Sequence, residues 1–431
     1  MATATIREAV VSEAVAVETP SLRTSFKWMV GGYAFYAACQ WGMLSTLAKA
    51  GNATIVGQFA LGLAISAPVF MFTNLNLRGA QATDARSDFD FADYFTLRVL
   101  ASLAGVLTVA TIVGFLNYGV ATRMVIILLG VSKAIESLGD AIAGLLQKVE
   151  RLHQVAISIM LRGALSIAAF GITFLVLRSL VAAVCALVLS WSAVLLGYDL
   201  WRGAAALGEG KRFLRFHPAQ LRRLLVHSAP LGVVMTLISL NANIPRYLLV
   251  KYLGEAELGI FASMAYMLQA LYLVVYALGE SAAARLARMF ALGDVCGFRR
   301  VTGKLVWIGV AILVLGAILS TLLGRPLLTI LYRSEYGKDL SVFVIMMMGG
   351  GVTAIGYFLG YGINAARRFW LQVPVIALST VMNAAMTAVL APRLGLMGAA
   401  LALLSAALVH VFGNALALRY ALGQIGPPAA T

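Results

Sequence analysis

Charged residues are scarce in this chain: Asp, Glu, Lys and Arg together make up only 12% of its 431 residues, whereas apolar residues make up 61%. Soluble domains carry roughly 25% charged residues, so the composition excludes an ordinary soluble protein and indicates a membrane protein. The chain also lacks the segments of about ten residues with alternating polarity that are typical of outer-membrane barrels. We therefore expect transmembrane helices rather than strands.

Residues that hold metals or form cross-links are also few. Two of the three cysteines, Cys39 and Cys185, fall in apolar runs, and Cys296 falls in a polar connection. The four histidines are scattered along the chain: His153, His217, His227 and His410. A disulfide framework, a zinc site and a catalytic triad are therefore not expected.

Apolar runs of membrane length dominate the sequence. A helix of about 20 apolar residues crosses about 30 Å of hydrocarbon, and the chain holds about twelve such runs. These runs start near Trp28, Ile55, Tyr94, Met124, Val155, Leu180, Leu224, Leu258, Leu305, Leu340, Trp370 and Gly395. The sequence thus predicts an all-α polytopic membrane protein with about 12 transmembrane helices.

The longest connection lies in the middle of the chain and divides the runs into six plus six. We predict five segments, namely a cytoplasmic N-terminal tail at 1–27, an N-lobe at 28–203, a cytoplasmic linker at 204–223, a C-lobe at 224–420 and a C-terminal tail at 421–431. Internal repeats of this kind are a common plan of transporters, in which a substrate site lies between two lobes.

A short repeat supports two similar halves. Four positions recur at an offset of 202 residues: Lys49 and Lys251, Gly57 and Gly259, Phe59 and Phe261, Ala60 and Ala262. Because both copies follow the first helix of a half, we interpret them as the outer turn of the first hairpin in each lobe. The alternative is a chance similarity between two membrane turns.

Basic residues are unevenly placed along the chain, which has a net charge of +15. They concentrate in the even-numbered connections, Arg78 among them, and six lie around the linker: Arg202, Lys211, Arg212, Arg215, Arg222 and Arg223. The positive-inside rule then puts both termini in the cytoplasm, as an even number of spans also requires. We expect a bacterial inner-membrane protein whose basic loops meet anionic phospholipids, not nucleic acid.

Ionisable residues inside a membrane span cost about 2.5 to 3.5 kcal/mol each, so they indicate function or pairing. The fourth run carries Lys133, Glu136, Asp140 and Gln147 on one helical face. The next run carries Arg162 at a similar depth to Asp140. One interpretation is a wet central cavity in which cations contact an anionic substrate. The alternative is a structural network that pairs Lys133 with Glu136 and Asp140 with Arg162.

The second half offers a smaller set of polar groups. Asn241, Asn243 and Arg246 approach the outer end of the seventh run, where Pro245 removes a backbone donor. Arg246 is a candidate substrate contact, with an arginine at the membrane interface as the alternative. Glu280 lies toward the inner end of the eighth run.

Nearly the whole chain resembles the polysaccharide flippases of the multidrug/oligosaccharidyl-lipid/polysaccharide exporter (MOP) superfamily. The segments that carry the resemblance are APVFMFTNLNLRGAQATD, SKAIESLGDAIAGLLQKVERLHQVAISIMLRG, SLNANIPRYLLVKYLGEAELGIFASMAY and PRLGLMGAALA. The resemblance implies a V-shaped pair of six-helix lobes around a cavity that opens alternately to each side. It also implies, as substrate, an undecaprenyl-pyrophosphate-linked oligosaccharide for O-antigen, capsule or exopolysaccharide synthesis.

By position, the resemblance assigns three roles. Cations for anion contact are Lys133, Arg162 and Arg246; carboxylates for coupling or gating are Glu136, Asp140 and Glu280; polar cavity-lining residues are Gln147, Asn241 and Asn243. No cofactor or metal is expected, and H⁺ or Na⁺ is the candidate coupling ion.

Three alternatives follow from the same residues. A cation-coupled multidrug exporter of the superfamily would favour acidic and aromatic groups in its cavity. A polysaccharide polymerase or ligase, an enzyme, would need a substantial outer loop, and the outer connections are short, so we expect no enzyme. A scaffold for a synthase complex is the third. The resemblance also implies two protein partners, a polysaccharide polymerase and a chain-length regulator.

Overall fold

The computed structural model describes residues 22–83, 89–208, 210 and 212–424. In its first half, up to the linker, the elements are α2 (Leu22–Ala50), α3 (Ala53–Asn74), α4 (Leu77–Thr83), α5 (Phe91–Phe115), α6 (Val120–Lys148), α7 (Leu152–Leu177), α8 (Leu180–Val194), the π-helical turn η1 (Leu195–Asp199) and α9 (Leu200–Leu207). The predicted N-terminal tail lies largely outside the described residues.

The second half has one long helix for each predicted run. Its elements are α10 (Pro218–Leu253), α11 (Glu255–Ala291), α12 (Val295–Leu331), η2 (Ser334–Gly337), α13 (Leu340–Ala365), η3 (Phe369–Leu371), α14 (Gln372–Leu394) and α15 (Leu396–Gly423). The connection between α9 and α10 falls inside the predicted linker. Most of the predicted C-terminal tail lies outside the described residues.

The helices fit a membrane in length and composition. Within the described ranges, ten helices are long and apolar enough to span one. Helices α2 and α6 reach 29 residues each but are more polar, α6 because it carries Lys133, Glu136 and Asp140. Large apolar side chains such as Leu103, Leu107 and Trp307 are exposed on the outside, where lipid would cover them. The prediction of an all-α, multi-pass membrane protein is confirmed.

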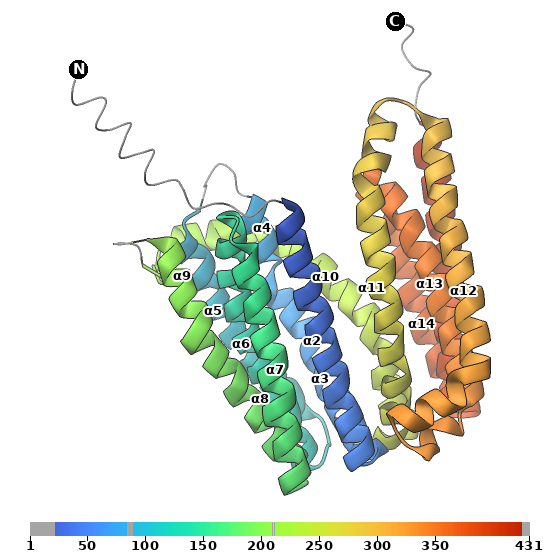
Figure 1. Cartoon of the computed structure of the whole chain (residues 1–431), viewed down its shortest axis with the longest axis horizontal. Coiled ribbons are helices and arrows are strands. Elements are labelled where there is room, and N and C mark those ends of the chain that lie inside the picture. The colour runs from blue at the N-terminus through green and yellow to red at the C-terminus, as the bar shows by residue number, and fades with distance from the viewer. Residues whose placement is uncertain (1–21, 84–88, 209, 211, 425–431) are drawn as a thin grey trace, which may run out of the picture.

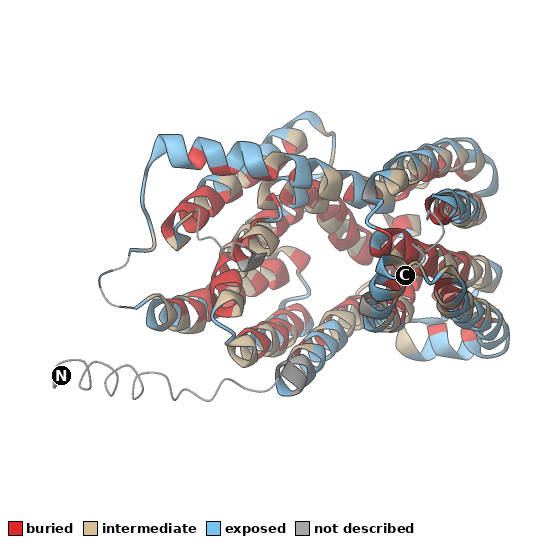
Figure 2. Ribbon diagram, turned by 90° about the horizontal axis from the view of Figure 1, so that it is seen from above, coloured by how far each residue is buried: buried red, intermediate tan, exposed pale blue. Residues whose placement is uncertain are grey.

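Two bundles form the molecule, as the V-shaped fold implied by the resemblance requires (Figure 1). Helices α2 to α9 form the N-lobe, and the last helices of the chain, α11 to α15, form most of the C-lobe. Helix α2 begins and α15 ends at the same end of the molecule as the α9–α10 connection, which we call the linker end. Viewed from above, buried residues line the insides of both bundles and exposed residues the outside (Figure 2).

The lobes contact each other at the opposite end, which we call the closed end. There Trp41 Nε1 of α2 donates a hydrogen bond to the hydroxyl of Tyr332, over 3.3 Å. The carboxylate of Glu255, at the start of α11, accepts bonds from Gln58 Nε2 and Thr122 Oγ1 of the N-lobe, each over 3.0 Å. Toward the linker end α2 and α11 diverge (Figure 1).

The repeated glycines lie at the centre of this closed-end contact. A Cβ atom at Gly57 would lie 1.7 Å from the carbonyl oxygen of Glu255, and one at Gly259 would lie 1.9 Å from the carbonyl oxygen of Ala53. Ala53 and Glu255 are separated by the same 202 residues as the two glycines. The repeat is therefore a structural one: equivalent helices α3 and α11 cross with equivalent contacts, each needing a residue without a side chain.

Helix α10 joins the two lobes. Its first turns pack on the N-lobe, where Leu221 and Leu224 meet Leu75 and Leu97. Its other half packs against α14 and α11 of the C-lobe and stays in contact with α3, where the Tyr247 hydroxyl donates to the carbonyl oxygen of Ala64. Helix α10 thus runs from the linker end of the N-lobe to the closed end, where it contacts both lobes (Figure 1).

Candidate functional site

Lys133 and Glu136 form an ion pair in the middle of α6, as the structural alternative predicted. The Nζ atom of Lys133 lies 2.7 Å from Oε2 of Glu136, and the two side chains are 27% and 32% exposed. Lys133 Nζ also lies 5.8 Å from the ring centroid of Trp191 in α8. The two charges neutralise each other, and both side chains are exposed enough to contact a ligand.

This pair lies beside the apolar core that the two lobes share. Ala134 and Ile135, which follow Lys133 in α6, pack against the same buried cluster as Tyr266 of α11. Tyr247, which follows Arg246 in α10, packs against that cluster too. Two predicted cations, one from each half of the chain, therefore border a common core.

Arg246 is the cation of this group that lacks a counter-charge. Its Nη1 atom donates to Oδ1 of Asn243 over 3.3 Å, and no carboxylate in the described part of the chain pairs with it. It lies seven residues before Leu253, about 10 Å along α10 from the closed end. That depth argues against an arginine that merely snorkels to the interface.

Asn241 and Asn243 lie beside Arg246 but make different contacts. Asn243 is buried, and its Nδ2 donates to the carbonyl of Ser239 over 2.8 Å. Pro245 has no N–H, so it leaves the carbonyl of Asn241, four residues earlier, without its helical donor. Asn383 Nδ2 of α14 approaches that carbonyl at 3.4 Å. Asn243 therefore contacts Arg246 within α10, and the backbone of Asn241 contacts α14.

Asp140 pairs with two arginines, and neither is Arg162. Its Oδ1 lies 3.0 Å from Nη1 of Arg78 in α4, and its Oδ2 lies 3.6 Å from Nη2 of Arg98 in α5. Gln147, a predicted lining residue, accepts a hydrogen bond from Arg78 Nε over 3.2 Å. The predicted Asp140–Arg162 pair is wrong.

Arg162 instead pairs with Asp199 in the π-helical turn. Its Nη2 lies 2.5 Å from Oδ2 of Asp199, whose Oδ1 accepts from Ser158 Oγ over 2.6 Å. Arg162 and Asp199 are buried, and a Cβ at Gly139 would lie 1.7 Å from Arg162 Nη2. Arg162 passes across the bare backbone at Gly139, which leads it to η1 and away from Asp140. In this conformation its charge is neutralised, so its role as an anion contact stays a prediction.

Sequence reasoning missed three members of these networks: Arg78, Arg98 and Asp199. Arg78 was counted among the topological charges of a connection, but α4 folds it back against α6. Arg98 follows the first turns of a long apolar helix, and Asp199 is a lone acid near the end of an apolar run. The cost of charges inside membrane spans was the signal that could have identified Arg98 and Asp199.

Glu280 lies apart from the α6 stripe. It lines a pocket of about 210 Å³ inside the C-lobe with Tyr276, Tyr357, His410 and Asn414. The hydroxyl of Tyr361 donates to its Oε1 over 3.2 Å. The structure therefore does not bring Glu280 together with Glu136 and Asp140.

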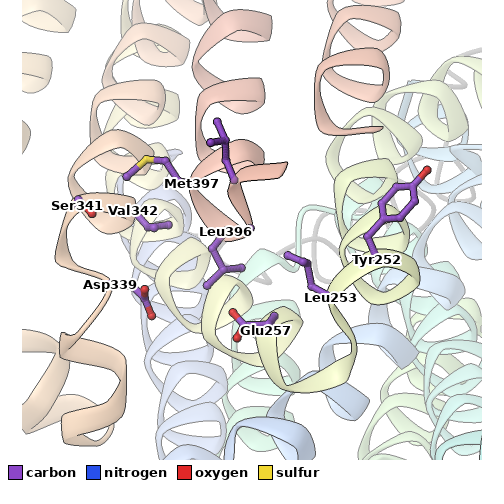
Figure 3. A pocket seen from close by; sticks show the side chains of 10 residues that line it. Tyr252, Leu253, Glu257, Asp339, Ser341, Val342, Leu396 and Met397 are labelled. Atoms are coloured by element: carbon purple, nitrogen blue, oxygen red, sulfur yellow. The ribbon is translucent and has the colours of Figure 1, made fainter. Parts of the chain in front are cut away.

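A larger pocket, of about 570 Å³, opens at the closed end (Figure 3). Its charged lining is acidic, from Glu257 and Asp339, so it does not suit an anion. In the described part of the chain, no group of three or more His, Cys, Asp and Glu side chains converges as metal ligands. Arg246, a cation without a carboxylate partner among the described residues, is therefore the candidate contact for an anionic ligand.

No family model matches the sequence. A capsular polysaccharide biosynthesis protein, CapF of Staphylococcus aureus, is 27% identical over 377 residues, which cover 88% of this chain and 94% of the relative. The sequence similarity thus extends over nearly both whole chains, lobes and linker included.

Solved structures share the architecture at low sequence identity. An inward-facing multidrug resistance MATE family transporter of the MOP superfamily has a TM-score of 0.71 at 14% identity and covers 91% of this chain and 96% of its own. The lipid II flippase MurJ, in an inward closed conformation, has a TM-score of 0.73 at 11% identity and covers 91% of this chain and 88% of its own. The resemblance drawn from the sequence is confirmed: this chain has the fold of the MOP superfamily transporters and flippases.

Proposed function

We propose that this chain is an alternating-access flippase of the bacterial inner membrane. It moves undecaprenyl-pyrophosphate-linked oligosaccharide repeat units from the cytoplasmic to the outer leaflet, for O-antigen, capsule or exopolysaccharide synthesis. The observation that carries the proposal is Arg246, a cation without a carboxylate partner among the described residues, next to Tyr247 on the apolar core that the lobes share. The similarity to a capsular polysaccharide biosynthesis protein supports the same substrate class.

The physics of the cargo fits this site. A pyrophosphate and the hydroxyls of a glycan lose too much hydration to cross hydrocarbon unaided. Cations inside the membrane offset that loss for the phosphate, and phenols and amides do so for the sugar. Lys133 and Arg246 are the proposed phosphate contacts, with Asn241, Asn243 and Gln147 as polar lining. The lipid tail stays in the bilayer while the head passes between the lobes.

The proposed orientation puts the linker end in the cytoplasm. Basic residues gather there, around the α9–α10 connection and in the turns after α11 and α13, as the positive-inside rule requires. Anionic phospholipids are their proposed counter-ions. In this orientation the structure is closed toward the outer face, the state that receives cargo from the cytoplasmic leaflet. A polysaccharide polymerase and a chain-length regulator are proposed to take up the product.

Coupling is proposed to use H⁺ or Na⁺ at Glu136, Asp140 or Glu280. When a phosphate takes Lys133, Glu136 loses its counter-charge and gains affinity for a cation. The same logic applies to Asp140 if its arginines turn to a ligand. Glu280 would act separately, inside the C-lobe. We propose no cofactor and no covalent chemistry: the proposed role is transport, and not polymerisation or ligation.

The test is translocation by the purified full chain in proteoliposomes, with Arg246→Gln as the site variant and Arg299→Gln as a matched control at an exposed position. We expect wild type and R299Q to move a fluorescent undecaprenyl-pyrophosphate oligosaccharide and R246Q to move at least about 10-fold less, the loss expected for one charge-assisted contact. Equal rates in all three would contradict the proposal.

A multidrug exporter is the second candidate, because the MATE family shares the fold. The same proteoliposomes decide between the two with a cationic dye such as ethidium. Dye transport in the absence of lipid-linked sugar transport would favour the exporter. Formation of glycosidic bonds by the purified protein would favour an enzyme.

A further inference from the structure

A second cationic cluster lies at the linker end of the N-lobe, separate from the lobe junction. It consists of Arg78, Arg98 and Asp140, with Gln147 on its rim. Asp140 is seven residues from Lys133, about 10 Å along α6 toward the linker end. The cluster therefore comes before the Lys133 pair on the proposed path from the cytoplasm.

The cluster has a buried floor and an open rim. The Arg98 side chain is fully buried, whereas those of Arg78 and Asp140 are 22% and 31% exposed. Arg98 Nη1 donates to Asn74 Oδ1 over 2.6 Å and to Ser137 Oγ over 3.3 Å. Those two acceptors hold the guanidinium in place beneath the rim.

Two donor atoms of Arg98 are not satisfied by Arg78, Asp140 or Gln147. Its Nε and Nη2 atoms are buried and have no hydrogen-bond partner in the described part of the chain. The Oδ2 atom of Asp140 is the nearest acidic atom, at 3.6 Å, and is too far for a hydrogen bond. Buried donor atoms without acceptors are costly, so a ligand that supplies oxygen atoms to Nε and Nη2 would be bound strongly.

We propose that this cluster is an anion-binding site for a diphosphate, with Asp140 as an internal counter-ion that the ligand displaces. Among the described residues, two guanidinium groups share one carboxylate. A tethered carboxylate has a high effective concentration, so a ligand with a single negative charge competes poorly with it. A diphosphate carries two charges and oxygen atoms for two planar guanidinium groups at once.

The inference rests on the proposed function and deepens it. The cluster takes the pyrophosphate of the lipid-linked cargo at the linker end, before the head group reaches Lys133 and Arg246. Asp140 returns to the arginines when the cargo moves on, which leaves the entry site neutralised again. The coupling role predicted for Asp140 becomes here an exchange of one anion for another.

The test titrates sodium pyrophosphate into the purified full chain in neutral detergent, by isothermal calorimetry at constant ionic strength. We expect Arg78→Gln to raise Kd at least about 10-fold, because it removes a bidentate charge-assisted contact. Asp140→Asn is expected to lower Kd about 3-fold or more, because it removes the competitor. If Asp140 instead has a structural role, D140N raises Kd. An unchanged or higher Kd in D140N therefore overturns the proposal.

Arg78→Lys keeps the test decisive if D140N does not fold. It retains the charge but loses the planar fork, so we expect a Kd between those of wild type and R78Q. The matched control is Arg299→Gln, which removes an exposed charge on the C-lobe and is expected to leave Kd unchanged. Equal Kd values in wild type, R78K and R78Q, or no binding by wild type, would overturn the anion site.

Two further probes identify the source of the diphosphate. Farnesyl diphosphate carries it on a lipid, and uridine diphosphate carries it on a soluble group. Tighter binding of farnesyl diphosphate supports the lipid carrier, and tighter binding of uridine diphosphate contradicts it. If R246Q abolishes translocation while R78Q and D140N bind pyrophosphate like wild type, this inference fails and the proposed function stands. If R246Q translocates normally, the proposed function fails, and the titration still decides the anion site.

Discussion

Arg162 Nη2 lies 2.5 Å from Asp199 Oδ2, in a buried ion pair that rests on the backbone of Gly139. The contact joins α6, α7 and the π-helical turn. Arg162 is therefore held against α6 but is more buried than Lys133 and Glu136.

Gly139→Ala is expected to destabilise the protein by about 1–3 kcal/mol, because the new methyl group overlaps a guanidinium that its ion pair holds in place. Gly171→Ala, in the neighbouring helix α7, meets nothing within 4 Å and is the control. It is expected to be neutral or to stabilise by up to about 1 kcal/mol, the difference in helix propensity. Thermal unfolding in detergent measures both, and equal Tm values would contradict the assignment.

Asp199→Asn is expected to cost about 3–5 kcal/mol, since it leaves a buried guanidinium without a counter-charge. The double variant Arg162→Met with Asp199→Leu is expected to recover most of that loss, because it removes both charges. Translocation by the double variant then separates two roles for Arg162. Activity near wild type would show a structural role, and lost activity in a well-folded protein would restore its predicted role in anion contact.

Lys133→Ala is expected to reduce both stability and translocation, because Glu136 is then left unpaired within the membrane. The double variant Lys133→Ala with Glu136→Ala removes the pair and is expected to recover stability but not translocation. Recovery of both in the double variant would mean that the pair has no part in binding cargo. Protein levels in the membrane, polysaccharide export in cells and translocation in vesicles are the three measurements.

Gly57→Ala and Gly259→Ala are expected to open the closed end, each by the same mechanism, because either methyl group would overlap a carbonyl oxygen of the other lobe. Spin labels at Asn117 of the N-lobe and Lys338 of the C-lobe, both exposed, report the separation by pulsed electron resonance. We expect longer distances in both variants than in the parent protein.

The parent for that measurement has its three cysteines replaced by serine: Cys39, Cys185 and Cys296. Gly303→Ala in α12, where nothing lies within 4 Å, is the matched control and is expected to leave the distance unchanged. An unchanged distance in both G57A and G259A would contradict a gate held by the glycines.

Helix number and order could be predicted because long apolar runs and polar turns are local properties of the sequence. The pair of Lys133 and Glu136 was predictable for the same reason, as the residues lie one turn apart on α6. The partners of Asp140 and Arg162 were not, because they depend on how α4 folds back and on the space that Gly139 leaves. Which residues of α10 and α11 meet α3 depends on how these helices cross, and no local pattern in any of them encodes that.

The reciprocal contact of Gly57 and Gly259 has the form of an isologous interface, in which each partner offers the same groups to the other. Both halves run in the same direction, so their relating axis lies along the membrane normal, as in parallel repeats. Two identical six-helix chains could make this contact unchanged, so the two halves meet as the subunits of a symmetric homodimer would. The cations Lys133 and Arg246, in contrast, occupy non-equivalent positions in the two halves.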